Sequence, residues 1–213
     1  MDQTVPAIVV MGVAGCGKTS VAHAVAARLG GRFIEGDAFH SPANVDKMRR
    51  GIGLVDADRW NWLDRLAAEL KEARERGERV VLACSALKRR YRDRLRLGSP
   101  MARFIFLDLS QEEAAKRVGQ RSGHYMPDSL VASQFADLEA PIAETLTLTV
   151  DATRPVDAIV DQALHWHARA FLNTDHSAVI EDSAVFGDRT SAAMRSSVAP
   201  IGLAGADTRP IQR

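Results

Sequence analysis

Short runs of apolar residues alternate with longer stretches of helical periodicity along most of the chain. The run Ala7–Met11 is continuously apolar, which is typical of a strand buried on both faces of a sheet. Other runs have similar lengths and similar flanks. The predicted strands are Ala7–Met11, Arg32–Asp37, Val80–Ser85, Arg103–Leu109 and Thr145–Val150.

The stretches between these runs predict helices, because apolar residues recur there at helical spacing. Ser41 is a favourable N-cap, and Pro42 suits the first position of a helix. Gly77 is a typical residue to end one. The predicted helices are Gly17–Leu29, Pro42–Arg50, Asp58–Arg76, Leu87–Leu97, Gln111–Arg121, Leu130–Leu138 and Pro155–Phe171.

This alternation of strands and helices predicts an α/β fold, a five-stranded parallel sheet with helices on both faces. Ligands of such sheets bind beyond the carboxyl ends of the strands. Gly12, Asp37, Ser85 and the end of the segment "FLDLS" are therefore expected to converge at one edge. The periodicity fades after Asn173, where Ser, Ala, Gly and Asp dominate. We predict one domain over residues 1–172 and a disordered tail over residues 173–213.

Composition and charge argue against several functional classes. The 213 residues are 46% apolar and 26% charged, and the formal net charge is +1, so nothing global favours nucleic acid or an anionic membrane. No apolar run reaches the roughly 18 residues that span a bilayer, and the N-terminus lacks the basic region of a signal peptide. Cys16 and Cys84 are interpreted as buried thiols in a reducing compartment. We expect a cytoplasmic protein without nucleic-acid or membrane partners.

A glycine-rich turn between the first strand and the first helix carries the chemistry. It matches the phosphate-binding pattern G-x-x-x-x-G-K-[ST] without a mismatch. Backbone N–H groups of such a loop surround a phosphate, and the helix adds its positive end. Lys18 is expected to reach the β- and γ-phosphates of ATP, and the Thr19 hydroxyl to ligate Mg²⁺. The predicted nucleotide-binding residues are Gly12, Val13, Ala14, Gly15, Cys16, Gly17, Lys18, Thr19 and Ser20.

The segments that follow favour a small-molecule kinase over other proteins with this loop. The base-reading segments of a switch GTPase are absent, and the third strand lacks the acidic pair of a translocating ATPase. Asp37 ends the second strand on the edge where the γ-phosphate is expected. A hydroxyl acceptor needs a carboxylate there to orient it and accept its proton, so Asp37 is the predicted catalytic base. A turn aspartate, or a contact to Mg²⁺ through water, is the alternative interpretation.

Five segments together resemble the gluconate kinases, small P-loop kinases related in fold to shikimate and adenylate kinases. They read "MGVAGCGKTS", "EGDAFHSPANVDKMRRGIGLVDADRWNWL", "CSALKRRYRDRLR", "FIFLDLS" and "RSGHYMPDSLVASQFADLEAP", in this order from about Val9 to Thr149. The resemblance implies a three-layer α/β/α P-loop fold with a mobile lid. It also implies ATP-dependent phosphorylation of the 6-hydroxyl of D-gluconate, in cytoplasmic sugar-acid catabolism, by a homodimer.

The acceptor is an anion with several hydroxyls, so its site needs cations and hydrogen-bonding groups. Arg59 follows two acidic residues that are positioned to orient its guanidinium toward a carboxylate. A surface ion pair at the start of a helix is the alternative interpretation. Lys88 and Arg92 are four residues apart and are expected to share a helical face toward the substrate. The predicted substrate-binding residues are Asp37, His40, Arg59, Ser85, Lys88 and Arg92, with His40 assigned by the resemblance.

The segment "KRVGQRSGHYMP" is the predicted start of a lid that extends over about residues 117–135. Arg117 and Arg121, four residues apart, are expected to neutralise the transferring phosphoryl group together with Lys18. Solvated helix charges are the plainer interpretation of each arginine.

Two other functions stay open on the sequence alone. One is a kinase of another small hydroxy acid such as shikimate, and the other is a nucleotide-binding regulator without turnover. The basic run "KRRYRDRLR" also resembles a nucleic-acid patch, but its charges spread around a helix, so a partly solvated helix face is favoured.

Overall fold

The five predicted strands form one parallel sheet. The computed structural model describes residues 6–120 and 128–169. The strands follow the order β2-β3-β1-β4-β5, and every hydrogen-bonded pair is parallel. The strands are β1 (Ile8–Met11), β2 (Arg32–Glu35), β3 (Val80–Ala83), β4 (Arg103–Asp108) and β5 (Thr147–Asp151). The predicted fold class is therefore confirmed.

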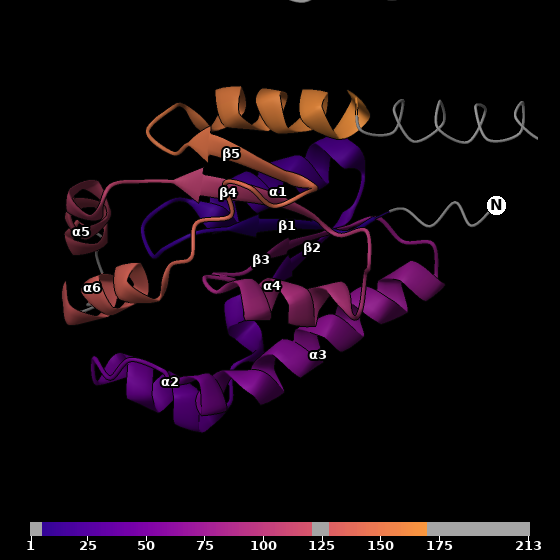
Figure 1. Cartoon of the computed structure of the whole chain (residues 1–213). Helices are drawn as coiled ribbons and strands as arrows, with labels where there is room; N and C mark the ends of the chain where they lie inside the picture. The colour runs from indigo at the N-terminus through magenta and orange to yellow at the C-terminus, as the bar shows by residue number, and fades with distance from the viewer. Residues whose placement is uncertain (1–5, 121–127, 170–213) are drawn as a thin grey trace, which may run out of the picture. The chain divides into compact units, whose positions relative to one another are not determined.

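Helices lie on both faces of this sheet, as the alternating pattern predicted. They are α1 (Lys18–Leu29), the short 3₁₀ helix η1 (Gly36–Phe39), α2 (Pro42–Arg49), α3 (Asp56–Glu75), α4 (Arg89–Arg96), α5 (Gln111–Gly119), α6 (Asp128–Asp137) and a helix over residues 156–169. Figure 1 shows α1 and helix 156–169 on one face and α3 and α4 on the other. The helices α5 and α6 lie beyond the end of the sheet toward which the arrows of β4 and β5 point (Figure 1).

Two apolar layers hold the helices to the sheet. Ile8 and Val10 of β1 belong to the cluster that includes α1 and helix 156–169, whereas Val9 and Met11 belong to the cluster that includes α3 and α4. Successive side chains of a strand point to opposite faces, so a strand with helices on both sides must be apolar at every position. This requirement explains why the first strand is continuously apolar in the sequence.

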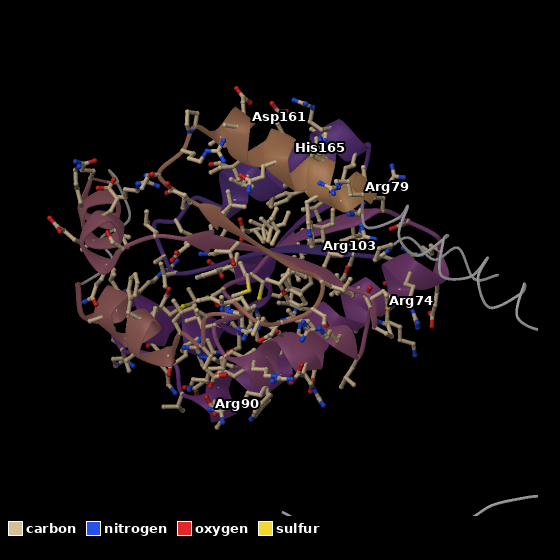
Figure 2. The ribbon with its side chains drawn as sticks, turned by 45° about the horizontal axis from the view of Figure 1, so that its top comes forward. Arg74, Arg79, Arg90, Arg103, Asp161 and His165 are labelled. Carbon is tan, nitrogen blue, oxygen red and sulfur yellow. The ribbon has the colours of Figure 1, made fainter. Side chains whose placement is uncertain are left out.

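Polar contacts reinforce the outer edges of the layers. Arg28 of α1 and Asp161 of helix 156–169 form an ion pair with a distance of 2.8 Å between Nη2 and Oδ1. Figure 2 shows Asp161 and His165 on this helix, above the sheet. His165 is exposed, whereas His167 is buried and contacts Arg103 of β4. The two histidines therefore point to different sides of their helix and form no joint metal site.

The second strand is shorter than predicted, and this difference matters for the site. β2 ends at Glu35, and Asp37 lies in η1 instead of at a strand end. A Cβ on Gly36 would lie 2.4 Å from the Ala83 carbonyl oxygen, so only glycine fits at this bend. The bend turns the following side chains toward the carboxyl edge of the sheet.

Two sequence predictions lie partly or wholly outside the described residues. The predicted lid includes residues 121–127, which the structure does not describe, so a mobile lid stays a prediction. The predicted tail over residues 173–213 and the domain boundary at residue 172 also lie outside the described residues. Within the two described ranges, no helix combines the length and the apolar character that a membrane span requires.

Candidate active site

The glycine loop joins β1 to α1 in a conformation that requires glycine. Gly12 and Gly15 have φ angles of +140° and +82°. A Cβ on Gly12 would lie 2.9 Å from the Leu107 carbonyl oxygen, and one on Gly15 would lie 2.9 Å from the Ala114 carbonyl oxygen. The loop is therefore packed tightly against β4 and α5, and its curvature follows from residues without side chains.

Two polar side chains at the start of α1 turn toward the loop and toward β2. Lys18 Nζ donates a hydrogen bond to the Val13 carbonyl at 2.9 Å, so the amino group folds back over the loop. Thr19 Oγ1 donates to Glu35 Oε2 at 2.7 Å. A carboxylate thus lies directly beside the hydroxyl that is expected to ligate Mg²⁺.

A cavity of about 130 Å³ opens beside the loop. The predicted residues Asp37, His40, Arg59 and Ser85 all line it together with Lys18 and Thr19. The expected convergence is therefore observed for Asp37 and Ser85, whereas Gly12 and the end of the segment "FLDLS" do not line the cavity. The other lining residues come from the loop, from α2 and the segment after it, and from α6: Ala14, Gly15, Gly17, Met48, Gly53, Leu54, Leu130, Ser133 and Gln134.

The acidic group in this cavity is available to a ligand. The Asp37 side chain is 68% exposed, and its Oδ1 lies 4.0 Å from His40 Nε2. It shares the cavity wall with Lys18 and Thr19. This arrangement places a carboxylate and the amino group that is expected to bind phosphates beside one small cavity, which is what transfer of a phosphoryl group to a hydroxyl requires.

His40 is held rigidly beside this carboxylate. Its imidazole is 5% exposed and stacks on Trp62, with 4.2 Å between ring centroids. Trp62 Nε1 donates to the Gly36 carbonyl at 2.8 Å, which ties the stack to the bend before Asp37. Burial lowers the pKa of His40, the carboxylate of Asp37 opposes this effect, and the Arg59 guanidinium adds to it. The ring is therefore neutral near pH 7, and its buried Nδ1 has no hydrogen-bond partner among the described residues.

Arg59 is oriented, but not by its sequence neighbours. Its Nε and Nη2 donate to the Leu54 carbonyl at 3.3 and 3.1 Å, and Nη2 also contacts Asp137 Oδ2 of α6 at 3.2 Å. The two preceding acidic residues, Asp56 and Asp58, instead pair with Lys88 and Lys47. The prediction that they orient the guanidinium is therefore wrong.

Lys88 lies next to the cavity and not in its wall. It lines an adjoining groove that shares Gly53, Leu54 and Ser133 with the cavity. Lys88 Nζ bridges two carboxylates, Asp56 Oδ1 at 3.0 Å and Asp137 Oδ1 at 2.8 Å. The hydrogen bond to Asp137 and the one to Asp56 raise the pKa of Lys88, despite partial burial. The Tyr91 hydroxyl and Lys88 hold the pKa of Asp56 at about 2.

The expected shared face of Lys88 and Arg92 needs correction. α4 begins at Arg89, and Lys88 is its extended N-cap with φ of −95° and ψ of 149°, so the spacing rule of a helix does not apply. The Arg92 guanidinium is fully buried and donates to the Ala86, Leu87 and Glu139 carbonyls at 2.9–3.0 Å. It also pairs with Glu144. Arg92 does not line the cavity, and we assign it a structural role.

The basic surface of α4 is largely neutralised by carboxylates. Arg90 pairs with Asp56, and Arg94 pairs with Asp64. Arg96 contacts Asp93 at 2.9 Å and Glu144 at 3.2 Å. Figure 2 shows Arg90 at the lower margin of the molecule, on the α4 side. This pairing favours the partly solvated helix face over a patch for a phosphate backbone.

The structure does not place either of the two arginines predicted to neutralise the phosphoryl group in the wall of the cavity. Arg117 of α5 does not line it. Arg117 Nε donates to Glu113 Oε1 at 3.0 Å and Nη1 donates to the Ala152 carbonyl at 3.0 Å, which links α5 to the turn after β5. Arg121 lies outside the described residues.

Comparisons with known proteins agree with this arrangement. Residues 8–145 match the family model described as an AAA domain. The gluconokinase of Gluconobacter oxydans (strain 621H) is 45% identical over 162 residues, covering 76% of this chain and 91% of that protein. The thermosensitive gluconokinase of Escherichia coli (strain K12) is 41% identical over 155 residues, covering 72% and 83%.

The chain belongs to the gluconokinase family.

A solved gluconokinase from Sinorhizobium meliloti 1021 superposes on this family member with a TM-score of 0.73 at 46% identity, covering 82% of this chain and 98% of that one. A shikimate kinase from Bacteroides thetaiotaomicron has a TM-score of 0.56 at 18% identity, which shows a shared fold alone. The predicted resemblance to gluconate kinases, and their relation in fold to shikimate kinases, are therefore confirmed.

The site of this gluconokinase-family chain contains residues that the sequence analysis missed. Glu35 is two positions before Asp37 in the segment "EGD", and the strand end could have drawn attention to it. Gln134 and Asp137 lie in the segment "SQFAD" at the end of α6. No local signal indicates their contacts, because their partners Ala14 and Arg59 are 120 and 78 residues away in the sequence.

The described residues of this family member offer oxygen groups beside the P-loop that would suit a metal ion shared with phosphates. Among the described residues, no group of three or more His, Cys, Asp or Glu side chains could hold a metal ion. The Thr19 hydroxyl and the Glu35 carboxylate lie together beside the loop. Oxygen groups of this kind suit Mg²⁺, which keeps several waters and shares its remaining positions with phosphates.

Proposed function

We propose that this protein transfers the γ-phosphate of ATP to the 6-hydroxyl of D-gluconate, which gives 6-phospho-D-gluconate and ADP. The observation that carries the proposal is the common cavity of Asp37, Lys18 and Thr19, with His40, Arg59 and Ser85 in the same wall. Membership of the gluconokinase family supports the choice of acceptor. The cytoplasm as location and a homodimer as the assembly are further proposals that follow from the same resemblance.

The nucleotide end of the site consists of backbone donors and one amino group. The N–H groups of the Gly12–Thr19 loop and the N-terminus of α1 favour a polyphosphate. Among the residues that the structure describes, the hydrogen bond of Lys18 Nζ goes to a carbonyl, at 2.9 Å, so its charge is available to the β- and γ-phosphates. Thr19 and Glu35 would hold Mg²⁺ and its waters. When bound, the ion neutralises charge on the phosphates.

The acceptor end supplies the proton acceptor. The 6-hydroxyl donates a hydrogen bond to the Asp37 carboxylate, and its proton passes to Asp37 as the oxygen forms a bond to the γ-phosphorus and ADP leaves. The neutral His40 ring lies beside Asp37 in the cavity wall, where its edge would contact the sugar acid next to the reacting hydroxyl. A ring fixed by stacking on Trp62 costs little entropy to position.

The negatively charged end of gluconate needs a cation at a distance from the phosphates. Arg59 suits this role because its guanidinium is planar, buried to 8% exposure and already fixed by the Leu54 carbonyl. Lys88, in the adjoining groove, would contribute charge without forming the cavity wall. Ser85 would offer a hydroxyl from the segment just after β3. Arg121, and Arg117 after it leaves Glu113, remain our candidates for charge neutralisation on the transferring group.

A substrate panel tests this proposal. The full chain is incubated with MgATP and one acceptor at a time, including D-gluconate, D-gluconate lactone, shikimate and glycerate, and ADP release is coupled to NADH oxidation. We expect a kcat/KM for gluconate at least about 10²-fold above every other acceptor. A preference for shikimate, or turnover independent of any acceptor, would contradict the proposal. Single-turnover measurement with gluconate separates a kinase from a regulator that only binds nucleotide.

A further inference from the structure

One side chain of α6 accepts a hydrogen bond from a loop N–H group of the kind that binds phosphate. The Ala14 N–H donates to Gln134 Oε1 at 2.7 Å, and both residues line the cavity. This N–H belongs to the set that surrounds phosphate oxygens in loops of this kind. The amide oxygen of Gln134 thus takes a place where a phosphate oxygen would accept a hydrogen bond.

A second side chain of α6 forms ion pairs with the two cationic side chains of the acceptor end. Asp137 Oδ2 lies 3.2 Å from Arg59 Nη2, and Asp137 Oδ1 lies 2.8 Å from Lys88 Nζ. The side chains of Arg59 and Lys88 are 8% and 17% exposed, so water screens these contacts only partly. The two oxygens of one carboxylate thus satisfy the two cations that we assign to the carboxylate of the sugar acid.

The two contacts are mechanically linked. Residues 134 and 137 are three positions apart in a regular helix and therefore lie on one face. Leu130 and Ser133 of the same helix also line the cavity, and Val131 anchors it in the apolar cluster that contains α1. A shift of α6 that takes Gln134 away from Ala14 therefore also disturbs Asp137.

We propose that α6 is an internal competitor for both substrates. Gln134 takes the place of a phosphate oxygen and Asp137 takes the place of the acceptor's carboxylate. Each ligand must displace one of these contacts, and displacement by the first ligand removes part of the cost for the second. The two ligands therefore bind with positive coupling. The Asp137 half of this proposal rests on the proposed function, whereas the Gln134 half requires only that the loop binds a nucleotide.

Calorimetric titration of the full chain with Mg²⁺ and the non-hydrolysable analogue AMP-PNP tests the first half. Removing the competitor in Gln134→Ala is expected to lower the Kd for the analogue about three- to tenfold, the range of one net hydrogen bond. Gln134→Glu keeps an acceptor for the Ala14 N–H and adds a charge that repels phosphate, so its Kd should rise. A general structural defect would shift both variants in the same direction. Gln111→Ala, at an exposed position of α5, is the matched control and should bind as the wild type does.

An unchanged or raised Kd in Gln134→Ala would overturn this half, because Gln134 would then be neutral or would contact the bound nucleotide.

Titration of gluconate with and without AMP-PNP tests the second half. We expect the analogue to lower the Kd of gluconate by about fivefold or more in the wild type. In Asp137→Asn, gluconate alone should bind more tightly. The ratio of the gluconate Kd without AMP-PNP to the Kd with it should fall toward one. Asp157→Asn, an exposed carboxylate of helix 156–169, is the control. Equal coupling in Asp137→Asn and wild type would overturn the proposed link. Absence of gluconate binding in the wild type would refute the proposed function and the Asp137 half, while the AMP-PNP titrations would still decide the Gln134 half.

Discussion

The nucleotide end and the acceptor end of the cavity are built in different ways. The nucleotide end is one continuous segment, Gly12–Thr19, whose shape depends on glycines and on the first turn of α1. The acceptor end combines η1, the start of α3, the end of β3 and α6. Its key contact, between Arg59 and Asp137, joins residues 78 positions apart. A local motif therefore suffices to identify the first end, whereas the second depends on the tertiary structure.

The largest expected effect on ligand binding concerns the nucleotide end. Gly12→Ala would place a Cβ 2.9 Å from the Leu107 carbonyl oxygen at a φ of +140°, a conformation that costs alanine about 1–3 kcal/mol. We expect the loop to deform and the Kd for MgATP to rise about 10- to 10²-fold. Equilibrium titration with a fluorescent ATP analogue measures this change. Gly119→Ala is the control, since a Cβ there meets nothing within 4 Å. If Gly12→Ala binds as tightly as wild type, the nucleotide end does not depend on this backbone shape.

The next effect separates structure from substrate binding among the arginines. Arg92→Ala leaves Glu144 and three backbone carbonyls without their buried partner, so the free energy of unfolding should fall by about 3–5 kcal/mol. Urea denaturation followed by circular dichroism gives this value. The folded fraction should retain a gluconate KM close to that of wild type. A stable Arg92→Ala protein with a strongly raised KM would restore Arg92 as a substrate residue.

Arg59→Lys probes the acceptor end more gently. Lysine keeps the charge but loses the planar fork that contacts both the Leu54 carbonyl and Asp137. The KM for gluconate should rise about tenfold, the scale of one charge-assisted hydrogen bond, while the KM for ATP stays unchanged. Steady-state kinetics with each substrate varied in turn shows the difference. Arg28→Lys serves as the control, because Arg28 of α1 is exposed and forms an ion pair with Asp161. An equal rise in both KM values would mean that the two ends are not separate.

The smallest effect concerns neither end. Burial, then the positive charges of Arg103 and Arg79, lower the pKa of His167 from 6.5 to about 4. Below pH 6.5 His167 binds a proton in the unfolded chain but stays neutral in the folded chain. The free energy of unfolding therefore has its full value above pH 6.5 and decreases as the pH falls toward 4. His167→Gln should reduce this loss by on the order of 1–2 kcal/mol. Urea denaturation at pH 7 and pH 4.5 measures it, and identical pH dependence in both proteins would contradict the assignment.

The same contrast explains what could be predicted from the sequence. The boundaries of β1 and β4 lie within one residue of the prediction, because strands buried on both faces must be apolar throughout. The roles of Lys88 and Arg92 were misjudged because α4 starts two residues later than predicted, which leaves Lys88 outside the helix and removes the spacing argument for the pair.

Long-range pairing limited the prediction of the acceptor end in a similar way. Arg59 has acidic neighbours at positions 56 and 58, and the sequence alone favours those as partners. In the structure, Asp56 and Asp58 instead form ion pairs with two lysines, and Arg59 forms one with Asp137. Only the relative positions of α3, α4 and α6 decide between these pairings.

The most direct measurement compares Asp37→Asn with Asp46→Asn, two changes at similarly exposed carboxylates, with exposed fractions of 68% and 64%. Asp37 is claimed to accept the proton of the hydroxyl across from the terminal phosphate, so its loss should reduce kcat with gluconate by at least about 10²-fold. The Kd for MgATP should remain within about twofold of wild type in both variants. Full turnover in Asp37→Asn, with the same ATP affinity, would contradict the mechanism.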